Sequence, residues 1–122
     1  MILCDTNILI EFYKNNPEVD AVLRSVGYTN LAISIITQAE LYFGALNKHE
    51  LEAIKRHLSL INRLQIDGET SQRFIRLMES YSLSHKLAIP DALIAATAIE
   101  NGLALYTLNL RDFRFIQDLE LF

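Results

Sequence analysis

The chain opens with Met1-Ile2-Leu3-Cys4-Asp5-Thr6-Asn7, a short apolar run that stops abruptly at an aspartate. Four apolar residues followed by small polar ones predict a buried β-strand that ends just before Asp5. Strands buried on both faces are typical of a parallel sheet that has helices on either side. This stretch therefore predicts the class of fold and also places a carboxylate at the end of the first strand.

Beyond this stretch, apolar strands alternate with amphipathic helices. We predict strands at residues 1–4, 31–36, 64–66 and 103–107, with residues 119–122 as the candidate for a fifth. We predict helices at residues 8–14, 17–26, 37–46, 50–62, 69–84 and 90–101. The alternation predicts an α/β fold with three layers, in which a mainly parallel sheet of about five strands lies between two layers of helices.

Length and composition limit the class of protein. A chain of 122 residues has the size of one compact domain, and we expect residues 1–122 to form it. The single cysteine, Cys4, excludes an internal disulfide and favours a reducing compartment. We find no pattern of a signal peptide and no apolar run long enough for a membrane span, so we expect a cytoplasmic protein without membrane contact.

Four acidic residues map to one edge of the predicted sheet. Asp5 follows the first strand, and Asp112 follows the fourth. Glu40 and Asp91 fall in the first turns of the helices predicted at residues 37–46 and 90–101. A crossover helix runs antiparallel to its strands, so helix N-termini and strand C-termini meet at the edge where α/β proteins bind ligands. We therefore expect the four side chains to converge.

Converging carboxylates predict a particular chemistry. Oxygen ligands suit hard divalent cations such as Mg²⁺. A cation held in this way activates water and stabilises the charge of a phosphoryl displacement. The formal net charge of −4 by itself argues against nucleic acid, but bound cations reverse the local field, so charge leaves that question open.

Each of the acids also has a purely structural interpretation. Asp5 could end its strand with an Asx turn. Glu40 completes a capping box, Thr37-Gln38-Ala39-Glu40, at the start of its helix. Asp91 could simply favour the helix dipole, and Asp112 could cap a helix over residues 113–117. The convergence of all four on one edge is what favours a functional interpretation.

Four segments occur in order along essentially the whole chain. They are Asp5-Thr6-Asn7; Ser34-Ile35-Ile36-Thr37-Gln38-Ala39-Glu40-Leu41 with Gly44; Pro90-Asp91-Ala92-Leu93-Ile94-Ala95-Ala96-Thr97-Ala98; and Leu105-Tyr106-Thr107-Leu108-Asn109-Leu110-Arg111-Asp112-Phe113. In this order and spacing they resemble the motifs of the PIN-domain ribonucleases, in particular the VapC-type toxins of toxin–antitoxin pairs.

The resemblance implies an endoribonuclease that depends on Mg²⁺ or Mn²⁺ and cleaves RNA phosphodiester bonds with metal-activated water. It also implies a homodimer and a cognate antitoxin as partner. Asp5, Glu40 and Asp91 match the three most constant acids of the family, with Asp5 and Asp91 as principal metal ligands. Many members carry the fourth acid where this chain has Asn109, whereas the acid here is Asp112, and both residues remain candidates for that place.

Further residues are expected around the carboxylates. Hydroxyl and amide groups that could orient them, or support a water, come from Thr6, Asn7, Thr107 and Asn109. Arg111 and Arg114 lie near the predicted site and could contact RNA phosphates. We expect the remaining cations and the histidines at the surface or at helix ends, among them Lys14, Lys48, Lys86, His49, His57 and His85.

Three other functions compete with a nuclease. A phosphatase of the haloacid dehalogenase type would need a second aspartate where this chain has Asn7. A receiver domain would need paired acids at the first strand, and Cys4-Asp5 lacks that pair, although Asp67 does follow a predicted strand. A catalytically silent interaction module with this fold would not need all of the acids. The ribonuclease is therefore the function that we predict.

Overall fold

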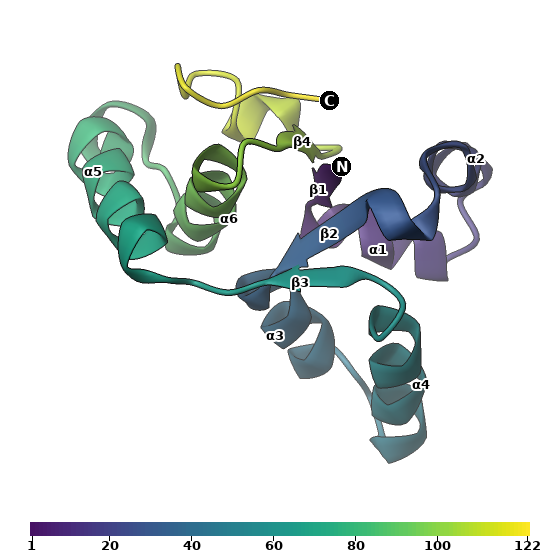
Figure 1. Ribbon diagram of the computed structural model, residues 1–122. Helices are drawn as coiled ribbons and strands as arrows, with labels where there is room; N and C mark the ends of the chain where they lie inside the picture. Colours follow the sequence, from purple (N-terminus) through teal and green to yellow (C-terminus); the bar gives the residue numbers. More distant parts are fainter.

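A four-stranded parallel sheet runs through the computed structural model, which describes residues 1–122 (Figure 1). Its order is β3-β2-β1-β4, and the strands are β1 (Ile2–Cys4), β2 (Leu31–Ser34), β3 (Asn62–Leu64) and β4 (Ala104–Tyr106). The strand β1 pairs with both β2 and β4, so that Leu3 lies opposite Ala32 on one side and Leu105 on the other. The opening stretch of the chain is therefore an inner strand of the sheet.

Residues 119–122, the candidate for a fifth strand, do not form a complete strand. Only Leu121 pairs with β4, through an isolated parallel bridge to Leu105. Hydrogen bonds from Ile116 N to Phe113 O and from Leu119 N to Ile116 O close short turns in the segment before it. These turns bend the chain, so only its last residues run beside β4.

Helices cover both faces of the sheet, which confirms the three-layer prediction (Figure 1). One face is covered by α1 (Thr6–Tyr13), α2 (Pro17–Val26) and α4 (Lys48–Leu58), and the other by α5 (Gly68–His85) and α6 (Ile89–Glu100). Successive side chains of a strand point to opposite faces. Accordingly, Ile2 and Cys4 pack in the first core and Leu3 in the second.

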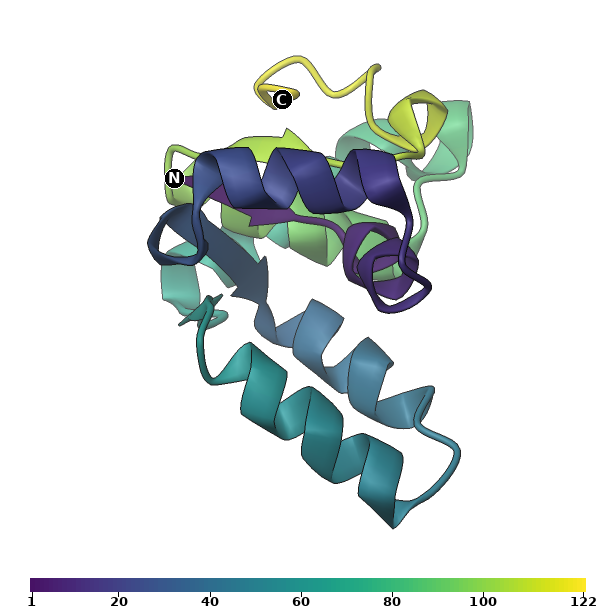
Figure 2. The same ribbon diagram turned by 90° about the vertical axis from the view of Figure 1, so that its right-hand side faces the viewer.

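The helix α3 (Ile35–Phe43) begins at the carboxyl edge of the sheet and extends, beside α4, away from the body of the molecule (Figure 2). Ser34, the last residue of β2, caps it, because Ser34 Oγ accepts a hydrogen bond of 3.2 Å from Thr37 N. The helix therefore starts two residues earlier than predicted. The capping box considered for Thr37 and Glu40 does not form. Glu40 lies in the second turn of α3, where it is free to interact with other elements.

The last crossover brings the chain back to the sheet through α6. Pro90 lies in its first turn, as predicted, and Ala92, Ala95 and Ala96 are fully buried against the neighbouring core. After α6, Gly102 adopts a φ of 62°, a left-handed conformation that glycine enters at little cost, and turns the chain into β4. None of the helices combines the length and the apolar character needed to cross a membrane.

We predict that Leu3→Ala lowers the free energy of unfolding by about 2–5 kcal/mol, because it leaves a cavity beside an inner strand that cannot easily collapse. Urea unfolding of the purified protein measures this change. Leu83→Ala is a matched control at a side chain that is 87% exposed, and it should change stability by less than about 0.5 kcal/mol. Equal losses in the two variants would contradict the core described above.

Candidate active site

The carboxylate of Asp5 is buried at the end of β1, with 5% of the residue exposed, and three donors hold it. Thr6 N donates to Oδ1 at 2.8 Å, while Thr107 Oγ1 and Asn7 Nδ2 donate to Oδ2 at 2.8 and 3.2 Å. Asp5 also caps α1. A turn or capping role for Asp5 is therefore real, but that role uses only Thr6 N. The bond to Thr107, 102 residues away in the chain, fixes the second oxygen independently of the cap.

The side chain of Asn7 links the first helix to the loop that follows β4. Its Nδ2 donates to Asp5 and lies 3.5 Å from Thr107 Oγ1, and its Oδ1 accepts from Leu108 N at 3.3 Å. Thr107 Oγ1 in turn accepts from Asn109 N at 3.0 Å. Thr107 and Asn7, which we expected beside the carboxylates, therefore form a continuous hydrogen-bond network with Asp5.

Glu40 is brought to the same edge by the hydroxyl of Thr6. Thr6 Oγ1 donates to Glu40 Oε1 at 2.7 Å, and it lies 3.0 Å from the hydroxyl of the buried Thr37. Glu40 itself is exposed. Its carboxylate therefore belongs to the network around Asp5 and not to the cap of its own helix.

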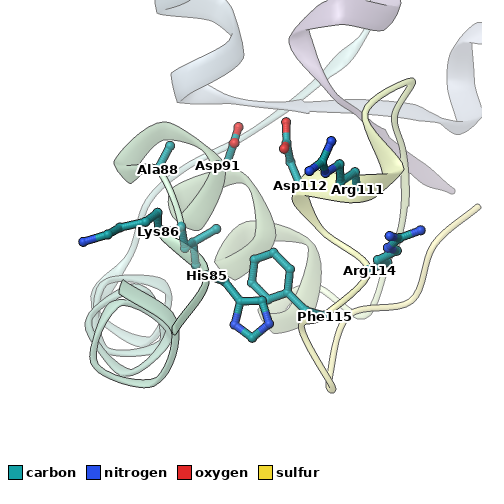
Figure 3. A pocket seen from close by; sticks show the side chains of 9 residues that line it. His85, Lys86, Ala88, Asp91, Arg111, Asp112, Arg114 and Phe115 are labelled. Atoms are coloured by element: carbon teal, nitrogen blue, oxygen red, sulfur yellow. The ribbon is translucent and has the colours of Figure 1, made fainter. Parts of the chain in front are cut away.

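Asp91 and Asp112 line an open cleft of about 510 Å³ beside this network (Figure 3). Asp91 projects from the first turn of α6, and Asp112 is the last residue of the 3₁₀ helix η2 (Leu110–Asp112). Figure 3 shows their carboxylates at the same end of the cleft. Asn109 caps η2 without a hydrogen bond from its side chain, and the helix predicted at residues 113–117 is absent, so the capping role considered for Asp112 is wrong.

Electrostatic repulsion couples these acids. Burial, together with the smaller effect of the charges of Asp5, Asp112 and Glu40, raises the pKa of Asp91 to about 6. Burial also raises the pKa of Asp5, although the hydrogen bonds from Thr107 and Thr6 N oppose this and the charges of Glu40 and Asp112 add to it. The site therefore holds more negative charge than its own donors neutralise.

The donor set fits a hard divalent cation. Every candidate ligand is a carboxylate, hydroxyl or amide oxygen, and a cation would relieve the repulsion that, in addition to burial, raises the pKa of Asp91. No three of the acidic, histidine or cysteine side chains come close enough together to bind one ion jointly. Mg²⁺ does not require such a group of three, because it usually keeps several waters and binds only one or two carboxylates directly.

The same cleft is also lined by residues that the sequence did not predict there. Arg111 and Arg114 line the cleft as expected, but His85, Lys86 and Phe115 line it as well. The signal was available, because α5 ends at His85, only a few residues before Asp91. A connection that short has to run along the same edge as the start of α6.

We predict that Asp91 contributes less to stability as the pH rises in metal-free protein. The pKa of Asp91 is about 6 in the folded state against an ordinary value of 3.8. Because the folded state binds this proton more tightly, Asp91 stabilises the fold below about pH 4 and loses that contribution as the pH rises through about 6.

Urea unfolding at about pH 4 and about pH 7, with chelator present, tests this sign. Asp91→Asn cannot titrate at this position, so it should become more stable relative to the wild-type chain as the pH rises. A difference between the two proteins that stays constant across this range would contradict the raised pKa.

Comparison with known proteins gives a consistent result. The family model described as PIN domain matches residues 2–117. Ribonuclease VapC4 of Mycobacterium tuberculosis is 31% identical over 126 residues, which cover 97% of this chain and 92% of the relative. Among solved structures, a toxin–antitoxin complex from Klebsiella pneumoniae has a chain 34% identical, with a TM-score of 0.84 and coverage of 98% and 95%.

A second solved structure, DNA-bound VapBC from Salmonella typhimurium, is 26% identical, with a TM-score of 0.88 and coverage of 100% of this chain and 98% of that chain. The family match spans all four carboxylates of the candidate site. The chain therefore belongs to the PIN-domain family and, within it, to the group of the VapC proteins.

Proposed function

We propose that this chain is an endoribonuclease dependent on a divalent metal, and that it is the toxin of a toxin–antitoxin pair. The observation that carries the proposal is the acidic cluster at the carboxyl edge, where burial and the charges of three neighbouring acids raise the pKa of Asp91. An uncompensated acidic cluster beside an open cleft is suited to a cation that binds phosphate. The names of the relatives, such as Ribonuclease VapC4, support RNA as the substrate.

In this proposal Asp5 and Asp91 hold the principal Mg²⁺ or Mn²⁺, and Glu40 completes the site through water. Asp112 or Asn109 supports a second cation or orients the attacking water. When bound, the cation supplies Lewis-acid stabilisation of the phosphate and lowers the pKa of water. Thr107, Asn7 and Thr6 act as positioning residues for the carboxylates.

Positively charged side chains line the same cleft as the acids, which suits the binding of a polyanion such as RNA. Lys86, Arg111 and Arg114 line the cleft together with Asp91 and Asp112. Cations at the rim attract the phosphates that flank the scissile bond, while the carboxylates hold the metal. The haloacid dehalogenase alternative is disfavoured, because the second aspartate that it needs is Asn7, whose amide donates to Asp5.

We further propose that the chain forms a homodimer and binds an antitoxin. The titles of the solved relatives name toxin–antitoxin and VapBC complexes. The chain also exposes large apolar side chains at and just after the end of α3, Phe43 at 93% and Leu46 at 86%. Exposed apolar surface of this kind is typical of protein–protein contacts.

Asp5→Asn should reduce RNA cleavage by more than about 100-fold, since it weakens the metal site at its best-held carboxylate. Cleavage of a labelled single-stranded RNA is measured with Mg²⁺, with Mn²⁺ and with a chelator, and the chelator should abolish cleavage by the wild-type chain. Asp20→Asn is the matched control, because Asp20 forms only an exposed ion pair with Arg24 on α2. Full activity of Asp5→Asn, or of the wild-type chain without metal, would refute the proposal.

Thr107→Val should lower activity by about 10- to 100-fold, because it removes the donor to Asp5 Oδ2 without touching a ligand. Thr107→Ser keeps the hydroxyl and should retain most of the activity. The loss in the valine variant should diminish as the Mg²⁺ concentration rises, since a misoriented carboxylate mainly weakens metal binding. Equal activities of the valine and serine variants would exclude this positioning role.

A further inference from the structure

An aromatic stack forms part of the cleft wall beside the carboxylates. The rings of His85 and Phe115 lie face to face, with centroids 4.2 Å apart and planes inclined by 11°. Tyr81 packs edge-on against both rings, at 5.7 Å from His85 and 5.2 Å from Phe115. His85 and Phe115 both line the cleft that contains Asp91 and Asp112 (Figure 3).

Hydrogen bonds connect the stack to neighbouring residues, although the stack is at the surface. Ser84 Oγ lies 2.8 Å from His85 Nδ1, and the hydroxyl of Tyr81 accepts a hydrogen bond from Gln117 N at 3.4 Å. Phe115 is half-buried, whereas His85 is exposed. The imidazole is therefore oriented by its neighbours while remaining open to a planar ligand.

The residue next to the stack adopts a costly backbone conformation. Lys86 ends α5 with a φ of 53°, in the left-handed region where helix ends usually place glycine. Residues kept in such conformations concentrate at functional sites. At this position the chain places a lysine, which lines the cleft together with Arg111 and Arg114.

We propose that the His85–Phe115 stack binds an unpaired base of the RNA substrate, next to the phosphate that is cleaved at the carboxylates. The proposal rests on the ribonuclease function proposed above and specifies how the cleft recognises a single strand. Unpaired bases stack on aromatic side chains, histidine included, and each base offers such a face. The cations of the cleft then bind the adjoining phosphates.

A structural role predicts different behaviour. A histidine in the last turn of α5 can favour the helix dipole when charged, and its ring shields Phe115. Removal of such a group would lower stability, but it would not change how strongly RNA binding depends on any one base. The two roles can therefore be separated by a double-mutant cycle between protein and RNA.

The cycle uses the Asp5→Asn chain, which should bind RNA without cutting it, and a fluorescent single-stranded RNA that the wild-type chain cleaves. Each nucleotide flanking the cleavage site is replaced in turn by an abasic one. At one position the loss of the base should weaken binding at least about five-fold. With His85→Ala added, binding to intact RNA should fall by a similar factor, and the abasic change should then cost less than about two-fold.

Two further variants complete the test. His85→Phe retains the stacking face and should keep most of the affinity, while His49→Ala, at an exposed histidine on α4, should leave binding unchanged. If every abasic change costs the same with and without His85, or if His85→Ala weakens only the binding of a partner protein, the base-binding role is refuted while the ribonuclease proposal stands. If the wild-type chain cleaves no RNA, both proposals fail.

Discussion

The buried carboxylate of Asp5 is the interaction on which the site depends, because a charge removed from water must be satisfied where it lies. Thr6 N, Asn7 and Thr107 supply its hydrogen bonds. These donors come from α1 and from the loop after β4, so satisfying one carboxylate ties together segments about a hundred residues apart. Since Asp5 ends an inner strand that pairs on both sides, its position is also fixed by the sheet.

The acids near Asp5 are held in an arrangement that is electrostatically unfavourable. Burial opposes the ionisation of Asp91, and the charges of three other acids add to that effect. Natural proteins tend to break the rules of stable folding at functional sites and to compensate elsewhere. Here the compensation comes from two well-packed cores, one on each face of the sheet, which contain fully buried side chains such as Leu3 and Ile33. The strained Lys86 at the rim of the cleft fits the same pattern.

Most of the architecture was predictable because it depends on local patterns. The apolar run before Asp5 and the alternation of strands and helices led to the three-layer α/β fold, and the edge argument led to the four acids. The errors lay at the ends of elements. Ser34 rather than Thr37 caps α3. Both residue types are suitable caps, and the position at which β2 ends decides which of them takes that role. The chain after η2 turns too sharply to form a fifth strand.

By itself, the sequence determined the class of fold and the residue types available for chemistry, because burial patterns and strand ends are encoded within a few neighbouring residues. Only the tertiary structure decided which side chains meet. The bond of Thr6 to Glu40, that of Thr107 to Asp5, and the stacking of His85 on Phe115 all join distant segments. Such contacts follow from the packing of whole helices against the sheet, and no local pattern of residues specifies them.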